Sequence, residues 1–167
     1  MANETFIDNG TALLVNGEAG ADVAWSVEGL TNANGRVSAQ IDLGAAPRAF
    51  MFKWSCEVQF QATPTQGAGL ELYKASAPDA DATQIDGDVG SSDAALGDVD
   101  MRRNLKSIGY VVSENAAASE VCVASGMFEH YERYLTLVAY NASGATVNAT
   151  DSAFRFNLVP FHYAPCA

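Results

Sequence analysis

The sequence is poor in basic residues. Its 167 residues include nine Lys and Arg against 20 Asp and Glu, which gives a formal charge of −11. A nucleic-acid-binding protein needs cationic side chains to displace the counterions condensed on phosphates, and an anionic membrane surface makes the same demand. We therefore expect neither a nucleic-acid partner nor a membrane partner.

Cysteine and long apolar runs are also scarce. Cys56, Cys122 and Cys166 are odd in number and far apart, and no Cys-x-x-Cys occurs. This spacing indicates neither a disulfide framework nor a zinc site. No apolar run approaches the roughly 20 residues of a membrane-spanning helix. The N-terminal residues lack the basic start and apolar middle of a secretory signal, so we expect synthesis and assembly in a cytoplasm.

Catalytic motifs are missing as well. The two histidines, His130 and His162, each lie among aromatic residues, which is typical of histidines that pack beside rings. The chain contains no Gly-x-Ser-x-Gly, no His-Glu-x-x-His, no Gly-x-Gly-x-x-Gly and no P-loop. Paired carboxylates stay open as a catalytic alternative, since spacing in sequence does not report distance in space. We predict a protein that is not an enzyme and holds no cofactor.

What the sequence does contain is a set of strand patterns. Between Ala49 and Ala62 every second residue is apolar, namely Phe50, Phe52, Trp54, Cys56, Val58 and Phe60. A period of two with one mostly polar face predicts a long, half-buried strand, with Trp54 and Cys56 in the core. Similar signals predict strands within residues 11–16, 23–27, 37–43, 69–75, 104–112, 120–124, 134–140 and 154–158.

Two of these segments carry further information. In Tyr134 to Tyr140 both alternating sets are apolar or aromatic, which predicts a central strand buried on both sides. Pro160 is expected to end the last strand or to place it at a sheet edge, because proline has no N–H to donate.

About nine strands joined by Gly, Asn, Ser and Pro turns, with no helical pattern longer than about two turns, predict an all-β fold. We expect one domain, residues 1–167, built as a two-sheet antiparallel sandwich. Jelly-roll topology suits this number of strands, and an open barrel is the alternative.

The acidity is confined to two segments. Residues 1–35 hold five acids and no base, and residues 76–100 hold seven aspartates and no base. The second segment belongs to a long acidic loop, residues 76–103, that exceeds the about 12 to 15 residues at which a structureless loop becomes unusual. Few large apolar residues occur in it, so we expect it to be functional or mobile.

Clustered carboxylates in this loop, Asp86, Asp88 and Asp93, raise the question of calcium. An EF-hand loop needs acids at positions 1, 3 and 5, Gly at 6 and Glu at 12. Counted from Asp86, positions 5, 6 and 12 are Gly90, Ser91 and Gly97, so the pattern fails and we expect no bound calcium. Arg102 and Arg103 follow the loop and would serve either as its counter-charge or as a contact with an acidic partner.

Several short stretches together resemble a known class of proteins. They are Trp54-Ser55, Val58-Gln59-Phe60, 62–65, 70–73, 92–96, Arg103-Asn104-Leu105, Ile108-Gly109, Ser125-Gly126, Arg133-Tyr134 and 141–144. Over roughly residues 49–160 the chain resembles small virion structural proteins encoded beside the capsid genes of tailed bacteriophages, the capsid decoration or cement proteins.

This resemblance implies a small β-sandwich or jelly roll that assembles in the host cytoplasm onto a virion capsid. Its partner would be the major capsid protein, and its own state commonly a trimer. Segments that order on binding are expected in such adhesive proteins, and the arm of residues 1–10 and the acidic loop are the candidates. The candidate partner residues are Phe6, Ile7, Asp86, Asp88, Asp93, Arg102 and Arg103.

The alternative is a carbohydrate- or receptor-binding virion module associated with a tail or fibre. Such a module would use exposed aromatic residues as a platform, and Tyr73, Tyr131 and Tyr163 are the candidates.

Overall fold

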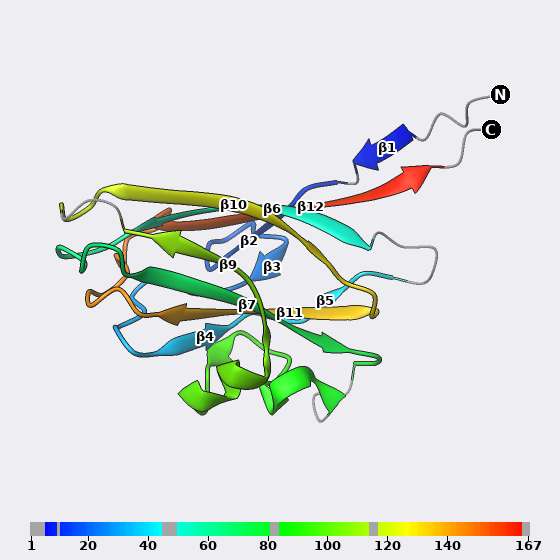
Figure 1. Cartoon of the computed structure of the whole chain (residues 1–167), viewed down its shortest axis with the longest axis horizontal. Coiled ribbons are helices and arrows are strands. Elements are labelled where there is room, and N and C mark those ends of the chain that lie inside the picture. The colour runs from blue at the N-terminus through cyan, green and yellow to red at the C-terminus, as the bar shows by residue number, and fades with distance from the viewer. Residues whose placement is uncertain (1–5, 10, 45–49, 81–83, 114–116, 165–167) are drawn as a thin grey trace.

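Two six-stranded sheets face each other across an apolar core (Figure 1). The structure, a computed structural model, describes residues 6–9, 11–44, 50–80, 84–113 and 117–164, with the backbone alone for residues 6–9 and 162–164. All strand pairs within these residues are antiparallel except β2 with β3. The predicted all-β, two-sheet antiparallel sandwich is confirmed.

Sheet A has the strand order β10-β6-β12-β2-β3, with β1 beside the end of β12. Its strands are β1 (Phe6–Asn9), β2 (Leu13–Asn16), β3 (Val23–Ala24), β6 (Met51–Gln59), β10 (Val121–Glu129) and β12 (Phe154–Ala164). The ribbon of β1 and the end of β12 extends beyond the rest of the sandwich (Figure 1).

Sheet B has the strand order β8-β4-β11-β7-β9, with β5 also paired to β11. Its strands are β4 (Gly35–Val37), β5 (Ile41–Asp42), β7 (Gly69–Ala77), β8 (Ala94–Ala95), β9 (Lys106–Val112) and β11 (Tyr134–Asn141). The described residues thus form twelve strands where about nine were predicted, because the structure has short strands such as β1 and β8 and divides 37–43 into two.

The alternation in β6 orients its side chains as predicted. Phe52, Trp54 and Cys56 point into the core and are at most 2% exposed, whereas Lys53 and Glu57 are exposed on the outer face. Burial raises the pKa of the Cys56 thiol, which keeps it protonated and makes it a small core residue.

β12 does not end at Pro160, contrary to one of the two outcomes expected for it, but on one side its pairing is interrupted at that residue. It pairs with β6 as far as Phe161, while on its other side β2 ends opposite Leu158 and β1 begins opposite Phe161. Pro160 therefore falls in the gap between two partner strands on that side. No strand of the described residues is paired with Pro160 on that side, so the missing N–H of proline costs no ladder hydrogen bond there.

The described part of the acidic loop, which we expect to be functional or mobile, packs against the sandwich. It contains two 3₁₀ helices, η2 (Asp86–Asp88) and η3 (Val99–Asn104), and lies over the outer face of sheet B (Figure 1). Its few large apolar side chains, Ile85, Val89, Leu96 and Met101, together with Leu105 just after it, form a second cluster with Tyr73, Ala75, Ala77, Val37, Tyr134 and Val138 of the sheet.

This second cluster explains the burial of β11. Seven of its eight residues, Leu135 to Asn141, are buried, because the main core covers one side and the acidic loop covers part of the other. The prediction of a strand buried on both sides is confirmed.

Between the edge strands β9 and β10 the core is closed by the indole of Trp54. A Cβ built on Gly109 would lie 2.1 Å from Trp54 Cζ2, and one built on Gly126 would lie 2.8 Å from Trp54 Nε1. The indole also stacks on Phe156, with ring centroids 5.8 Å apart and planes 9° apart. Glycine at these two positions leaves the room that the indole occupies.

We predict that Gly109→Ala lowers the free energy of unfolding by about 1–3 kcal/mol, because the added methyl group must displace a large buried ring. Thermal or urea unfolding measures the effect. The matched control is Gly97→Ala, whose Cβ would meet no heavy atom within 4 Å. Equal stability of the two variants would contradict the close packing of Trp54 on β9.

Candidate functional site

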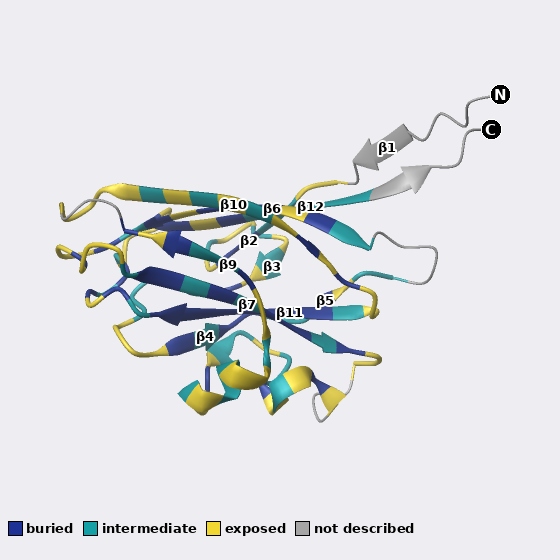
Figure 2. Cartoon of the chain, in the orientation of Figure 1, coloured by how far each residue is buried: buried dark blue, intermediate teal, exposed yellow. Residues whose placement is uncertain are grey.

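Exposed large apolar side chains gather on one part of the surface. Within the described residues they are Val112, Val121, Val123, Met127 and Tyr131, which we call the apolar edge. They belong to β9, β10 and the turn that follows β10. Val123 and Met127 are each 62% exposed, and β10 shows alternating exposed and intermediate residues in Figure 2. Exposed apolar patches of this kind mark interaction sites.

The apolar edge continues onto the outer face of sheet A. The strand register places Met127 beside Lys53 and Lys53 beside Val159, and in the next row Glu129 beside Met51 and Met51 beside Phe161. Apart from Lys53 and Glu129, these outward side chains are apolar. The rows lie at the end of the sheet from which the β1–β12 ribbon extends.

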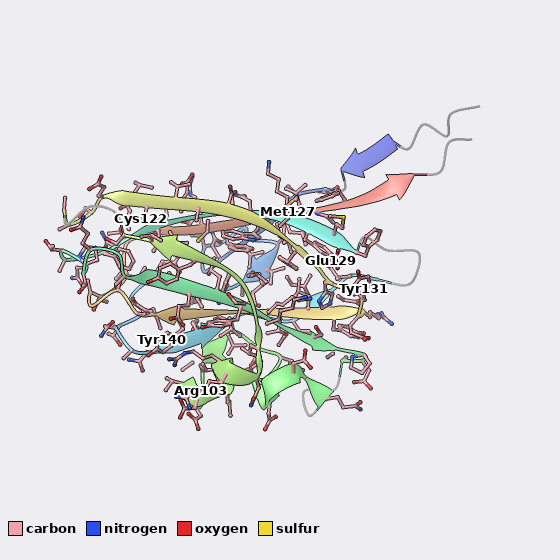
Figure 3. All side chains as sticks on the ribbon, in the orientation of Figure 1. Arg103, Cys122, Met127, Glu129, Tyr131 and Tyr140 are labelled. Carbon is pink, nitrogen blue, oxygen red and sulfur yellow. The ribbon has the colours of Figure 1, made fainter. Side chains whose placement is uncertain are left out.

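Tyr131 is held in place although it is 65% exposed. Its ring stacks on Phe50, with centroids 6.2 Å apart and planes 7° apart, and its hydroxyl donates to Glu129 Oε2 at 2.8 Å. The hydrogen bond to this carboxylate raises the pKa of Tyr131. Met127, Glu129 and Tyr131 lie near one another at the end of β10 (Figure 3).

The other candidate tyrosines do not join this surface. Tyr73 belongs to the second cluster on sheet B, where its hydroxyl donates to Glu71 at 2.5 Å. Burial and then the Glu71 carboxylate raise the pKa of Tyr73 to about 12. The side chain of Tyr163 lies outside the described residues. The predicted aromatic platform therefore reduces, on this surface, to Tyr131 and Phe50.

Among the predicted partner residues, Asp93 is engaged inside the chain. Its carboxylate accepts from Arg36 Nε at 2.6 Å and from the Ser26 hydroxyl at 2.5 Å, and also from the Ser26 backbone N–H. Burial raises the pKa of Asp93, but the hydrogen bonds from Arg36 and Ser26 outweigh it and hold the pKa below its usual value. Asp93 thus ties the acidic loop to β4 and to the segment after β3.

Arg102 also makes contacts within the chain. Its guanidinium stacks 3.8 Å above the Tyr140 ring centroid, lies 3.5 Å from Glu71 and donates to the Val99 carbonyl at 2.9 Å. These contacts fix η3 against sheet B and make Arg102 a counter-charge to Glu71.

The other predicted partner residues of the loop, Asp86, Asp88 and Arg103, are exposed. Asp86 is exposed and accepts from the Ser76 backbone N–H at 3.0 Å, and Asp88 is exposed as well. The Arg103 side chain is 75% exposed and lies 3.4 Å from Asp100. The structure does not bring these residues together with the arm: Phe6 and Ile7 lie in β1 of sheet A, opposite Ala164 and Tyr163, and their side chains are outside the described residues.

The described residues lack two other kinds of feature, a metal-binding cluster and a membrane-spanning helix. They contain no group of three or more His, Cys, Asp or Glu side chains arranged to hold a metal ion. They also contain no helix that is both long and apolar enough to cross a membrane. His130 is buried and packs edge-on against Phe52, as predicted, with Lys74 Nζ 3.4 Å from its Nδ1. The side chain of His162 lies outside the described residues.

One open groove, of about 260 Å³, lies beside β4. In sheet B this strand lies near the edge opposite to that formed by β9. It is lined by Ser26, Glu28, Gly29, Leu30, Thr31, Asn34, Gly35, Arg36 and Ala95. Burial raises the pKa of Glu28. The lining combines polar side chains with Gly, Leu and Ala residues and contains no aromatic residue.

No protein-family model matches the chain, and no curated protein matches its sequence.

The sequence predicted the core well but missed the apolar edge. The strand pattern was read only over 120–124, whereas β10 runs from Val121 to Glu129. A signal was present, since Val121, Val123 and Met127 share one alternating set while the other set has the small residues Ala124 and Gly126. Which set faces solvent follows only from the pairing with β6.

We predict that Asp93→Asn lowers the free energy of unfolding by about 1–3 kcal/mol at pH 7, because Arg36 loses its charged hydrogen-bond acceptor in a half-buried position. Asp88→Asn is the control. Asp88 is exposed with a φ of 53°, a conformation that Asn tolerates, so this variant should match the wild type. Chemical unfolding measures both.

The effect of Asp93→Asn should also depend on pH. Since the folded pKa of Asp93 lies below that of the unfolded chain, the carboxylate stabilises the fold above about pH 4. This contribution is lost as the pH falls through the folded pKa, so the wild type and the variant should converge in acid. A difference that stays constant down to pH 2 would contradict the assigned role.

Proposed function

We propose that this chain is a non-enzymatic virion structural protein that decorates and stabilises a phage capsid by binding between major capsid subunits. The resemblance in sequence suggests the class, and the β-sandwich fold is compatible with it. Function must be argued from a surface and not from a fold, because many unrelated functions share such sandwiches.

The strand order supports a jelly roll in particular. With β4 and β5 counted as one interrupted strand, the longer strands form the sheets β10-β6-β12-β2 and β4-β11-β7-β9. Every connection between successive strands of this set crosses to the other sheet except that from β7 to β9. From this order we infer a double-sheet jelly roll, an architecture common in viral capsid proteins and lectins.

The observation that carries the proposal is the contrast between the two outer faces. The outer face of sheet A bears charges of both signs that cancel, namely Lys53, Glu57, Glu129 and Arg155, and it continues into the projecting β1–β12 ribbon. The acidic loop, with seven aspartates in residues 76–100, covers the other sheet.

This contrast suggests an orientation on the capsid. The face whose charges cancel and the ribbon would contact the shell, since burying them desolvates fewer carboxylates than burying the acidic loop would. The acidic loop would point to solvent, where a high negative charge keeps particles apart.

We predict that deletion of residues 1–10 abolishes capsid binding without unfolding the sandwich, because the deletion removes β1 and leaves β12 paired with β6. Co-sedimentation with capsids that lack the protein, from the virus that encodes it, measures binding. Circular dichroism and thermal unfolding monitor the fold.

Arg103→Glu, an exposed change on the acidic side, is the control and should bind like the wild type. Undiminished binding of the truncated protein would contradict contact through the ribbon. Loss of binding by Arg103→Glu alone would assign the contact to the acidic loop.

The groove beside β4 favours a second candidate function, a carbohydrate-binding virion module. Thr31, Asn34 and Arg36 offer hydrogen-bonding groups in an open depression, as sites for sugar hydroxyls do. A glycan array tests it. Binding of a glycan that Asn34→Ala removes would support this function, and a blank array together with capsid binding would reject it.

A further inference from the structure

The four sheet edges of this protein are not equally protected against strand pairing. The edge strands β3 and β8 have two residues each. β9 has seven, but it begins with Lys106 and its register with β7 shifts at Leu72/Tyr73. Short length, lysine and irregular register are the usual means by which proteins block edge-to-edge pairing.

β10 has none of these protections. It is nine residues long and pairs with β6 over its whole length without a register shift. No other strand of the described part of the chain pairs with its second edge. Its sequence, Val-Cys-Val-Ala-Ser-Gly-Met-Phe-Glu, has no proline and no charge before Glu129.

The outward side chains of β10 make this edge more adhesive. Val121, Val123 and Met127 are exposed on the outer face, where the solvent-facing set of an edge strand is usually polar. They form most of the apolar edge defined above. A strand added beside β10 would cover these side chains and satisfy the backbone groups of the free edge together.

We propose that the partner of this edge is a second copy of the same chain, joined by antiparallel pairing of β10 with β10 about a two-fold axis at Ser125. Sheet A would then continue from one copy into the other. The inference goes beyond capsid decoration and does not depend on it.

The sequence of β10 is complementary to itself in this arrangement. On the outer face Val123 lies opposite Met127 of the second copy, and Ser125 lies opposite its own counterpart. On the inner face the small residues Ala124 and Gly126 oppose each other. Cross-strand pairs between apolar side chains stabilise a sheet, and the match occurs twice because of the two-fold axis.

The charges of β10 do not oppose the pairing. Glu129 lies opposite Val121 of the second copy, so the two Glu129 carboxylates are at opposite ends of the joined strands, about 27 Å apart at about 3.4 Å per residue. The aspartates of the acidic loop lie on sheet B, not on the joined sheet. The remaining repulsion is the long-range one between two chains of charge −11, which salt screens.

Light scattering after size-exclusion chromatography and sedimentation velocity of the full chain test the proposal. We expect a dimer whose dissociation constant falls as the salt concentration rises. The resemblance to decoration proteins implies a trimer instead, so a trimer, or a monomer at all concentrations up to about 100 µM, overturns the proposal.

Two valine-to-lysine variants separate edge pairing from contact through the face of sheet A. Val123→Lys should weaken the dimer at least about tenfold, because two lysines enter the joined edge. Val159→Lys, on the same outer face but on the inner strand β12, should leave it unchanged. Thermal unfolding checks that both variants fold. The reverse result would indicate face-to-face contact and overturn the proposal.

A cross-link reports the two-fold axis directly. In a background of Cys122→Ala and Cys166→Ala, Ser125→Cys should give a disulfide-linked dimer on oxidation, since opposed residues of paired strands have Cα atoms about 4.5–5.5 Å apart, within disulfide reach. Ser55→Cys is the control. Ser55 is the neighbour of Ser125 on β6, which places the two copies of residue 55 about 14 Å apart in the dimer. Equal cross-linking of the two variants, or none by Ser125→Cys, overturns the assigned register.

Discussion

The architecture depends on covering both faces of sheet B. β7 and β11 carry apolar side chains on both sides, so the main core satisfies one side and leaves Ala75, Ala77 and Val138 to be covered from outside. A loop with seven aspartates provides that cover with only four large apolar side chains, joined by Leu105 just after it. Polar anchors complete the attachment, since Asp93 binds Arg36 and Ser26 and Arg102 stacks on Tyr140.

The acidic loop covers the outer face of sheet B and not that of sheet A, so the outer face of sheet A stays open. The protein therefore has one sheet covered by the acidic loop and one open sheet that ends in a projecting ribbon (Figure 1). The long edge strand β10 borders the open face and carries most of the exposed large apolar side chains. The exposed apolar side chains of β10 and the acidity of residues 76–100 thus lie on different parts of the molecule.

Local patterns predicted what depends on local geometry. The alternation in β6 placed Trp54 and Cys56 in the core because successive side chains of any strand point to opposite faces. The ends of strands were predicted less well. β12 continues past Pro160, and β10 continues past Gly126 to Glu129, since both extensions depend on what lies beside the strand and not on its own sequence.

The sequence by itself determined the all-β class, the main core and the confinement of charge to two segments, because hydrophobic periodicity and charge are properties of the chain. Only the tertiary structure decided where that charge lies and which face stays open. Burial of Ile85, Val89 and Leu96 requires the outward side chains of β4, β7 and β11, which are distant in sequence. For the same reason the candidates Asp93 and Arg102 proved to hold the loop in place, while the apolar edge at Val123 and Met127 emerged only from the pairing of β10 with β6.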